Sequence, residues 1–177
     1  MMIAKAEGQG EEEIIALSAL LHDCDDHKLF HTGNNANARS FLEQEKLPAE
    51  VIEEICKNIN SVSFSKNRGK APETIEGKIV QDADRLDALG AIGIARTFYY
   101  GGSRGHNLYN DLPPRDLSQL SQEDYRQNQS SLAHFDEKLL KLADLMNTAS
   151  GRALAQERTA FMRQYLAQFW AEIKGEC

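Results

Sequence analysis

A group of acidic and imidazole side chains follows an apolar run near the start of the chain. Residues 18–30 are SALLHDCDDHKLF, in which His22 and Asp23 are neighbours and Asp26 comes three residues later. Packing of a hydrophobic core does not require so many polar groups in one stretch. An imidazole nitrogen beside a carboxylate oxygen suits a divalent ion such as Mn, Mg, Fe or Zn. The pair alone is a weak indication of a metal site.

A second acidic group lies further along the chain, in residues 81–90, QDADRLDALG. On one continuous helix, Asp84 and Asp87 would share a largely apolar face with Ala91, and Asp82 would point elsewhere. A carboxylate on such a face needs a partner because an isolated buried charge is costly. Two interpretations of Asp84 therefore stay open. It binds a metal ion, or it pairs with an arginine or caps a neighbouring helix.

Helical periodicity dominates the elements that must position these groups. β-branched residues never alternate with polar ones for long, so no sheet is expected. We therefore predict an all-α fold, a single-domain helical bundle. Apolar side chains recur at helical spacing in residues 11–24, 39–47, 48–62, 72–102, 132–146 and 151–173.

Residues 101–131 depart from the helical pattern. They are rich in Gly, Pro, Asn, Gln and Ser and poor in apolar side chains. Such a composition is typical of a long functional excursion rather than of a core element. We predict a mobile, lid-like segment within the domain.

Composition limits the partners and the compartment. The chain has 177 residues, enough for one domain with a core, and a net charge of −7. The excess of acidic residues argues against a nucleic-acid polymer as partner. No apolar run approaches the ~18 residues of a membrane span, so no membrane association is expected. Three scattered cysteines indicate a cytoplasmic protein without a disulfide framework.

Several long segments, taken together, resemble the HD-domain superfamily of metal-dependent phosphohydrolases, and in particular its bacterial YpgQ/YedJ-type subgroup. The resemblance covers residues 12–172 and implies an HD-type helical bundle. The segments that carry it are LLHDCDD, VQDADRLDALGAIGIARTF, YYGG, HFDEKLLKLADLMNT and ER..FM.

The resemblance implies roles for particular side chains. His22 and Asp23 match the doublet that binds the divalent metal ion, and Asp84 matches the last metal ligand. Asp26 matches the acidic position that helps to activate the attacking water. Lys28 is expected to neutralise a substrate phosphate.

The chain departs from the family at the first metal ligand, a His on a helix before the doublet. Residues 1–21 contain neither His nor Asp. The segment IAKAEGQG resembles the tail of that helix, so we expect residues 1–177 to form one HD domain that is incomplete at its N-terminus. A remote alternative is that His27 or His31 supplies the missing nitrogen.

Three further residues are candidates for substrate binding, each with a structural alternative. Arg96 is a candidate for the floor of the site, and a structural ion pair is an equal alternative. His134 and Lys138 are one helical turn apart and could together bind a polyphosphate. Their alternative is an ordinary helix surface.

The resemblance implies a phosphohydrolase that acts on a small phosphorylated substrate, most simply a nucleotide, in the manner of a nucleoside triphosphate pyrophosphohydrolase. The incomplete ligand set favours an alternative, an HD-fold protein that binds nucleotide or regulates without efficient turnover. A third hypothesis is a helical interaction protein whose acidic residues are only structural. The sequence leaves the metal, the substrate and homo-oligomerisation open.

Overall fold

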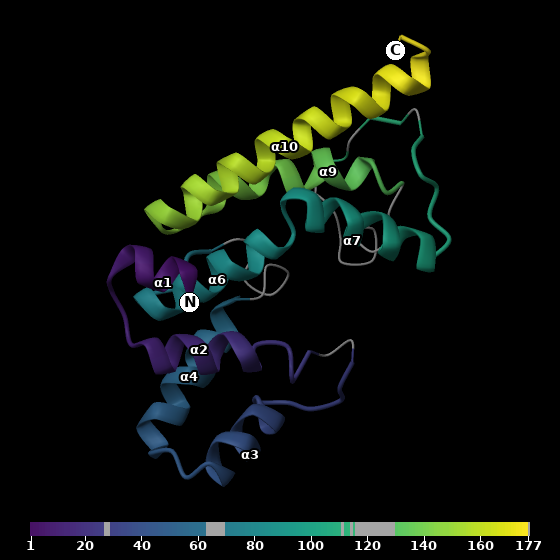
Figure 1. The fold of residues 1–177 in the computed structure, drawn as a ribbon. Coiled ribbons are helices and arrows are strands. Elements are labelled where there is room, and N and C mark those ends of the chain that lie inside the picture. Colours follow the sequence, from purple (N-terminus) through teal and green to yellow (C-terminus); the bar gives the residue numbers. More distant parts are fainter. Residues whose placement is uncertain (27–28, 63–69, 111, 114, 116–129, 177) are drawn as a thin grey trace. The chain divides into compact units, whose positions relative to one another are not determined.

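All regular secondary structure in the part of the chain that the structure describes is helical. The structure, a computed structural model, describes residues 1–26, 29–62, 70–110, 112–113, 115 and 130–176. No strand occurs in these ranges, and the predicted all-α class is confirmed. The helices in chain order are α1 (Met2–Glu7), α2 (Glu12–Leu21), α3 (Ala36–Gln44), α4 (Ala49–Val62), α6 (Ile75–Asp87), α7 (Gly90–Ser103), α9 (Ala133–Glu137), the 3₁₀ helix η2 (Leu139–Leu145) and α10 (Ala149–Lys174) (Figure 1).

Residue contacts divide the chain into two compact units. The first contains residues 1–84 and 147–151, and the second contains residues 85–146 and 152–177. The division falls inside α6 and α10. The single, N-terminally incomplete domain over residues 1–177 stays a prediction. So does the lid, because residues 116–129 lie outside the described residues.

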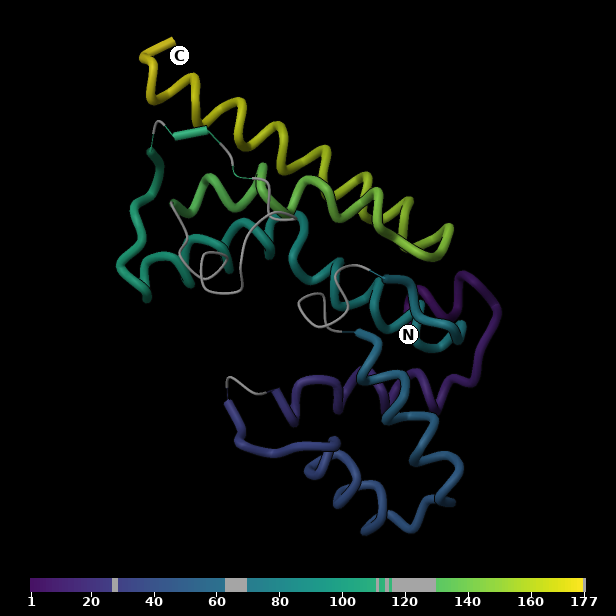
Figure 2. Tube along the Cα trace, turned by 180° about the vertical axis from the view of Figure 1, so that it is seen from behind, coloured from purple at the N-terminus to yellow at the C-terminus, as the bar shows by residue number. Residues whose placement is uncertain are grey.

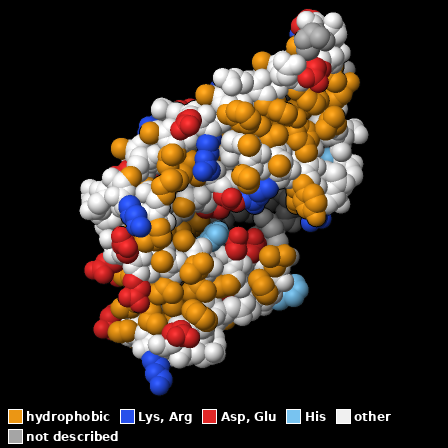
Figure 3. Space-filling view, in the orientation of Figure 1, with side chains coloured by type: hydrophobic (Ala, Val, Ile, Leu, Met, Phe, Trp, Pro, Cys, Tyr) orange, Lys and Arg blue, Asp and Glu red, His pale blue; other side chains and the backbone are white. Residues whose placement is uncertain are grey.

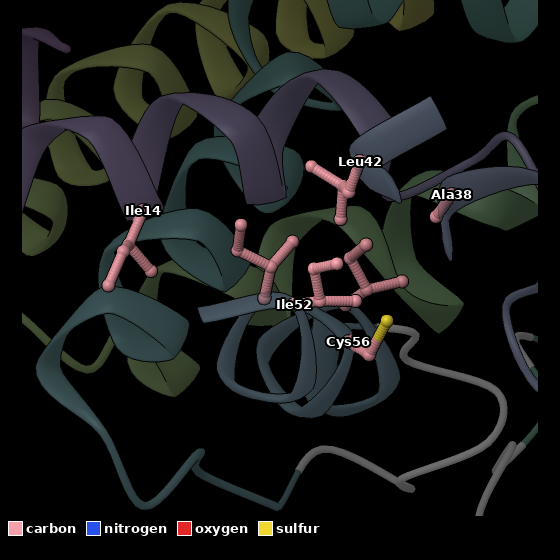
Figure 4. Close-up of a cluster of buried hydrophobic side chains, with 7 residues drawn as sticks. Ile14, Ala38, Leu42, Ile52 and Cys56 are labelled. Atoms are coloured by element: carbon pink, nitrogen blue, oxygen red, sulfur yellow. The ribbon is translucent and has the colours of Figure 1, made fainter. Parts of the chain in front are cut away.

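The first unit is built around α4, whose apolar side chains recur at helical spacing. α4 packs against α2 and α3, and both traces show α2 and α4 side by side (Figure 1 and Figure 2). Leu42 and Ile55 are fully buried in the cluster that joins the three helices. Leu21 and Cys24, at and just after the end of α2, are partly buried against this cluster, which supports the segment that carries the acidic group. The buried members of the cluster are Ile14, Ala38, Leu42, Ile52, Ile55, Cys56 and Ile59 (Figure 4).

The prediction of one helix over residues 72–102 is wrong, because the helix is interrupted after Asp87. α6 ends there, and α7 begins at Gly90, whose φ of 72° is in the left-handed region that suits glycine. Asp84 and Ala91 therefore lie on different helices. α7 continues one residue past the predicted end of the helix, to Ser103.

The helix predicted over residues 132–146 is also broken. Lys138, with φ of −133°, ends α9 and separates it from the 3₁₀ helix η2. Backbone hydrogen bonds tie the residues just before α9 to the early part of the 101–131 excursion, shortly after α7. Ser131 N donates to Asn107 O at 2.9 Å and Leu132 N donates to Leu108 O at 3.1 Å.

Aromatic rings and one buried ion pair support the second unit. Phe98 lies between Phe135 and Tyr165, with ring centroids 5.9 and 6.1 Å away. Arg115 Nε donates to Glu137 Oε1 at 2.8 Å, and the Glu137 side chain is only 1% exposed. The excursion is therefore anchored to α9 at Arg115.

The carboxylate of Asp82 is fully buried and holds the start of α10. Its oxygens accept hydrogen bonds from Asn147 N at 2.9 Å, Thr148 N at 2.8 Å and Thr148 Oγ1 at 2.7 Å. Negative charge at a helix N-terminus is stabilised by the unpaired N–H groups and by the helix dipole. Helix capping, which the sequence left open for Asp84, is thus the role of Asp82.

Charged side chains are spread over the face of the molecule in Figure 3. Lys and Arg side chains lie singly on that face rather than in a continuous basic surface. Among the described residues, no helix combines the length and the apolar character that crossing a membrane requires.

Replacement of Asp82 by Ala should lower the free energy of unfolding by about 3–5 kcal/mol, because several buried donors lose a charged acceptor together. The measurement is chemical denaturation followed by circular dichroism. Asp144→Ala, at an exposed position, is the control and should change stability by less than about 0.5 kcal/mol. If Asp82→Ala also lowers the free energy of unfolding by less than about 0.5 kcal/mol, Asp82 does not have the capping role.

Gly151→Ala tests the same cap from the other side. A Cβ at Gly151 would lie 2.6 Å from both Asp82 Oδ2 and Thr148 Oγ1. Gly→Ala inside a helix normally stabilises by about 1 kcal/mol, whereas this crowding should destabilise by about 1–3 kcal/mol. A Gly151→Ala variant more stable than the parent would show that Asp82 and Thr148 can move to make room for a methyl group.

Candidate metal centre

His22 and Asp23 lie in the turn that follows α2. The helix ends at Leu21, and His22 keeps helical angles of φ −60° and ψ −28° as its C-cap. His22 Nδ1 lies 2.8 Å from Ala19 O, the carbonyl one turn earlier in α2. Because that carbonyl can only accept a hydrogen bond, Nδ1 carries a proton and Nε2 faces away from the helix.

The structure brings His22, Asp23 and Asp84 together. His22 Nε2 lies 3.3 Å from Asp23 Oδ2 and 3.6 Å from Asp84 Oδ1. Asp84 comes from α6, whose start is capped by Thr74, since Thr74 Oγ1 accepts the Gly77 N–H at 3.1 Å. The side chain of His22 is 25% exposed and that of Asp84 is 41% exposed, so a solute can reach the group.

The two carboxylates make the surroundings of His22 favourable for positive charge. The contact with Asp84 is the largest influence and raises the pKa of His22, whereas burial lowers it. The bond to Ala19 O and the charge of Asp23 add to the rise, and the pKa increases from 6.5 to about 9. A divalent cation at Nε2 would take the place of this proton, so metal binding and protonation of His22 exclude each other.

The donors fit a divalent metal ion in kind. One imidazole nitrogen and two carboxylates are a usual ligand set for Mn, Fe or Zn, and a carbonyl partner on the other ring nitrogen orients the ligand. Within the described residues, however, no three His, Cys, Asp or Glu side chains are arranged closely enough to hold an ion. The group is therefore a set of candidate ligands that still needs closer approach or another donor.

The neighbouring Asp25 has a different role, which the sequence analysis missed. Its carboxylate accepts hydrogen bonds from Thr32 Oγ1 at 2.5 Å, Asn37 N at 3.0 Å and Ala38 N at 3.0 Å. Burial would raise the pKa of Asp25, but these hydrogen bonds outweigh it and hold the pKa below its ordinary value. Asp25 thus caps α3. The N-cap Asn35 has φ of 54° and makes no side-chain cap hydrogen bond, so Asp25 takes the capping role that Asn35 does not fill.

The structure describes only some of the other predicted residues near the His22–Asp23 doublet. Asp26 is half-buried, and its carbonyl accepts the N–H groups of Leu29 and Phe30, both at 2.9 Å. Its catalytic role stays a prediction. Lys28 and His27 lie outside the described residues. His31 is exposed, and its place as a substitute ligand stays a prediction.

The other three predicted substrate-binding residues, Arg96, His134 and Lys138, belong to the second unit. Arg96 Nη1 forms an ion pair with Asp87, and both side chains are largely exposed. Burial, and then the charge of Lys138, lower the pKa of His134 to about 4. At neutral pH, Lys138 is therefore the only cation of the two. Substrate binding by Arg96, His134 and Lys138 stays a prediction.

Titration of the metal-free chain should separate the two half-buried histidines, His22 and His134. In NMR spectra, the ring of His22 should titrate near pH 9 and that of His134 near pH 4. Asp84→Asn should move the midpoint of His22 toward 6.5 and leave that of His134 unchanged. Because the folded pKa of His22 lies above the unfolded one, its stabilising contribution is complete below about pH 6.5 and is lost as pH rises through about 9. A midpoint of His22 near 6.5 in the parent would show that the two carboxylates do not face it.

Known proteins are similar to this chain in both sequence and fold. The HD domain family matches residues 1–89. YpgQ of Bacillus subtilis is 40% identical over 176 residues, which covers 94% of this chain and 78% of YpgQ. A crystal structure of Bacillus subtilis YpgQ in complex with ADP is similar with a TM-score of 0.77 and 37% identity, over 98% of this chain and 83% of that chain. An HD-superfamily hydrolase from Bacillus thuringiensis is similar with a TM-score of 0.75 and 40% identity, over 98% and 79%.

These similarities extend over nearly the whole chain, and they include both the His22–Asp23 doublet and the helix that carries Asp84. The resemblance inferred from the motifs is confirmed: the chain belongs to the HD domain family.

Proposed function

We propose that the chain is a divalent-metal-dependent phosphohydrolase that cleaves phosphoanhydride or phosphoester bonds of nucleotides. The observation that carries the proposal is the meeting of His22 Nε2 with the Asp23 and Asp84 carboxylates at 3.3 and 3.6 Å. Membership of the HD family and the likeness to an HD-superfamily hydrolase support hydrolysis. The ADP bound to YpgQ supports a nucleotide as the substrate.

His22, Asp23 and Asp84 would hold the metal ion in this proposal. A divalent ion supplies Lewis acidity that polarises a phosphoryl oxygen and lowers the pKa of water. The hydrogen bond from His22 Nδ1 to Ala19 O keeps the imidazole ring in one orientation. Asp26, three residues after Asp23, is proposed to accept a proton from the attacking water.

The incomplete ligand set favours one alternative, a nucleotide-binding protein with little turnover. Within the described residues, no three His, Cys, Asp or Glu side chains lie close enough together to share an ion, and an ion held by few protein ligands is bound weakly. The alternative shares the nucleotide with the first proposal and differs only in catalysis. Binding and turnover therefore have to be measured separately.

Hydrolysis should depend on added metal and on Asp84. The measurement is release of phosphate and pyrophosphate from a panel of nucleotides with Mn²⁺, Mg²⁺ or Zn²⁺, with and without a chelator. Loss of a residue that only hydrogen-bonds to a metal ligand typically costs roughly 10- to 100-fold. Asp84→Ala should lower the rate by more than this, because it removes a ligand itself. The exposed Asp144→Ala should keep the parent rate.

The same panel separates the alternatives. If ADP raises the melting temperature of the parent but no metal supports product release, the nucleotide-binding alternative holds. If neither binding nor release occurs with any nucleotide, both assignments fail.

Lys138→Gln should raise KM for the preferred nucleotide roughly tenfold, since one charge-assisted hydrogen bond contributes about 1.5–3 kcal/mol. Lys138 is chosen over His134 because His134 is neutral at the pH of the assay. Lys141→Gln, an exposed lysine in the following 3₁₀ helix, is the matched control and should leave KM unchanged. Equal KM values for both variants and the parent would remove Lys138 from the substrate site.

A further inference from the structure

The segment that carries the metal doublet lies outside any helix. α2 ends at Leu21, and the following backbone is held by two turn hydrogen bonds, Cys24 N to Leu21 O at 3.2 Å and Asp26 N to Asp23 O at 3.1 Å. Turns of this kind are less rigid than helices unless other contacts fix them. Ligands for a metal ion must nevertheless be held within about 0.5 Å of their bound geometry.

Asp25 supplies the contacts that fix this turn. Both of its carboxylate oxygens accept backbone N–H groups at the start of α3, from Asn37 and Ala38. Thr32 adds a third donor, Oγ1 at 2.5 Å from Asp25 Oδ1. A carboxylate that accepts several donors at a helix N-terminus forms strong, charge-assisted hydrogen bonds.

A second bond runs between the same two segments and does not involve Asp25. The side-chain amide of Asn37 donates to Cys24 O at 2.8 Å. The turn is thus joined to α3 both through the Asp25 side chain and through the Cys24 backbone. α3 packs on α4, and α4 packs on α2. The turn is therefore held at both ends within the first unit, by α2 before it and by α3 after it.

We propose that Asp25 is a positioning residue that holds the turn so that His22 and Asp23 meet Asp84 and bind the metal ion. The inference rests on the proposed metal-dependent function, but it concerns a residue that donates no ligand. Asp25 acts through the turn, because its oxygens are occupied by the donors of α3. Its removal should weaken metal binding while every candidate ligand is still present.

The test compares Mn²⁺ binding by the metal-free chain and its variants, measured by the electron paramagnetic resonance of free Mn²⁺. Asp25→Ala should weaken Mn²⁺ binding by about 10- to 100-fold, the range for residues that support ligands. Asp25→Asn keeps one acceptor oxygen and should recover part of the affinity. Amide hydrogen exchange at Cys24 and Asp26 should be faster in Asp25→Ala than in the parent.

Glu7→Ala is the matched control for a simple loss of stability. Glu7 is also a carboxylate that accepts an N–H at the start of a helix, with Ser150 N 2.7 Å from Glu7 Oε1, and it belongs to the same unit. Its removal should therefore destabilise the chain similarly but leave Mn²⁺ affinity within about twofold of the parent, since additivity holds for distant sites. If Asp25→Ala does not fold, Asp25→Asn and Asn37→Ala replace it, and each should show a smaller loss of affinity.

The outcomes distinguish this inference from the function on which it rests. If the parent binds Mn²⁺ more tightly than Asp84→Ala but no tighter than Asp25→Ala, Asp25 does not position the ligands and only this inference fails. The same holds if Asp25→Asn and Asn37→Ala, used as replacements, keep the parent affinity. If the parent and Asp84→Ala bind Mn²⁺ equally, the metal centre itself is wrong.

Discussion

The buried carboxylate of Asp82 is the interaction on which much of the first unit depends. It joins α6 to the residues just before α10, 65 and 66 positions further along the chain, through the N–H groups of Asn147 and Thr148. A buried charge is tolerated only when its hydrogen-bonding capacity is filled. This requirement determines the direction of α6 at the point where Asp84, two residues later, has to face His22.

The aspartates of the two acidic groups differ in what occupies their oxygens. Asp25 and Asp82 are bonded to backbone N–H groups at helix starts. Asp23 and Asp84 instead face an imidazole, at 3.3 and 3.6 Å. A carboxylate occupied by backbone donors is poorly placed to bind a metal ion, whereas one that faces an exchangeable proton can exchange it for a cation. The same residue type therefore supports the fold at two positions and offers chemistry at two others.

Membership of the HD family agrees with these separate roles of the capping and the candidate ligand aspartates. The candidate ligands lie in the segment that the family matches, residues 1–89, and the helix that supplies Asp84 also forms the Asp82 anchor. A rigid anchor so near a ligand helps to preorganise it, because α6 continues without a break from Asp82 to Asp84. The likeness to an HD-superfamily hydrolase and to YpgQ, whose crystal structure contains ADP, supports the proposal of a nucleotide substrate.

Local information in the sequence determined the helical class and the apolar stripe of α4, and the motifs of the family resemblance indicated His22, Asp23 and Asp84 as candidate ligands. These features depend on neighbours within a few residues, on helical periodicity, or on motifs that can be recognised in one stretch. The tertiary structure decided which aspartates serve as caps, because donors such as Thr148 N lie far from Asp82 in the chain. It also decided the break between α6 and α7, where the pattern of apolar residues continues but the left-handed Gly90 does not follow the helix. Hydrogen-bond satisfaction of buried groups is a property of the whole packed chain, so no local pattern could have assigned these roles.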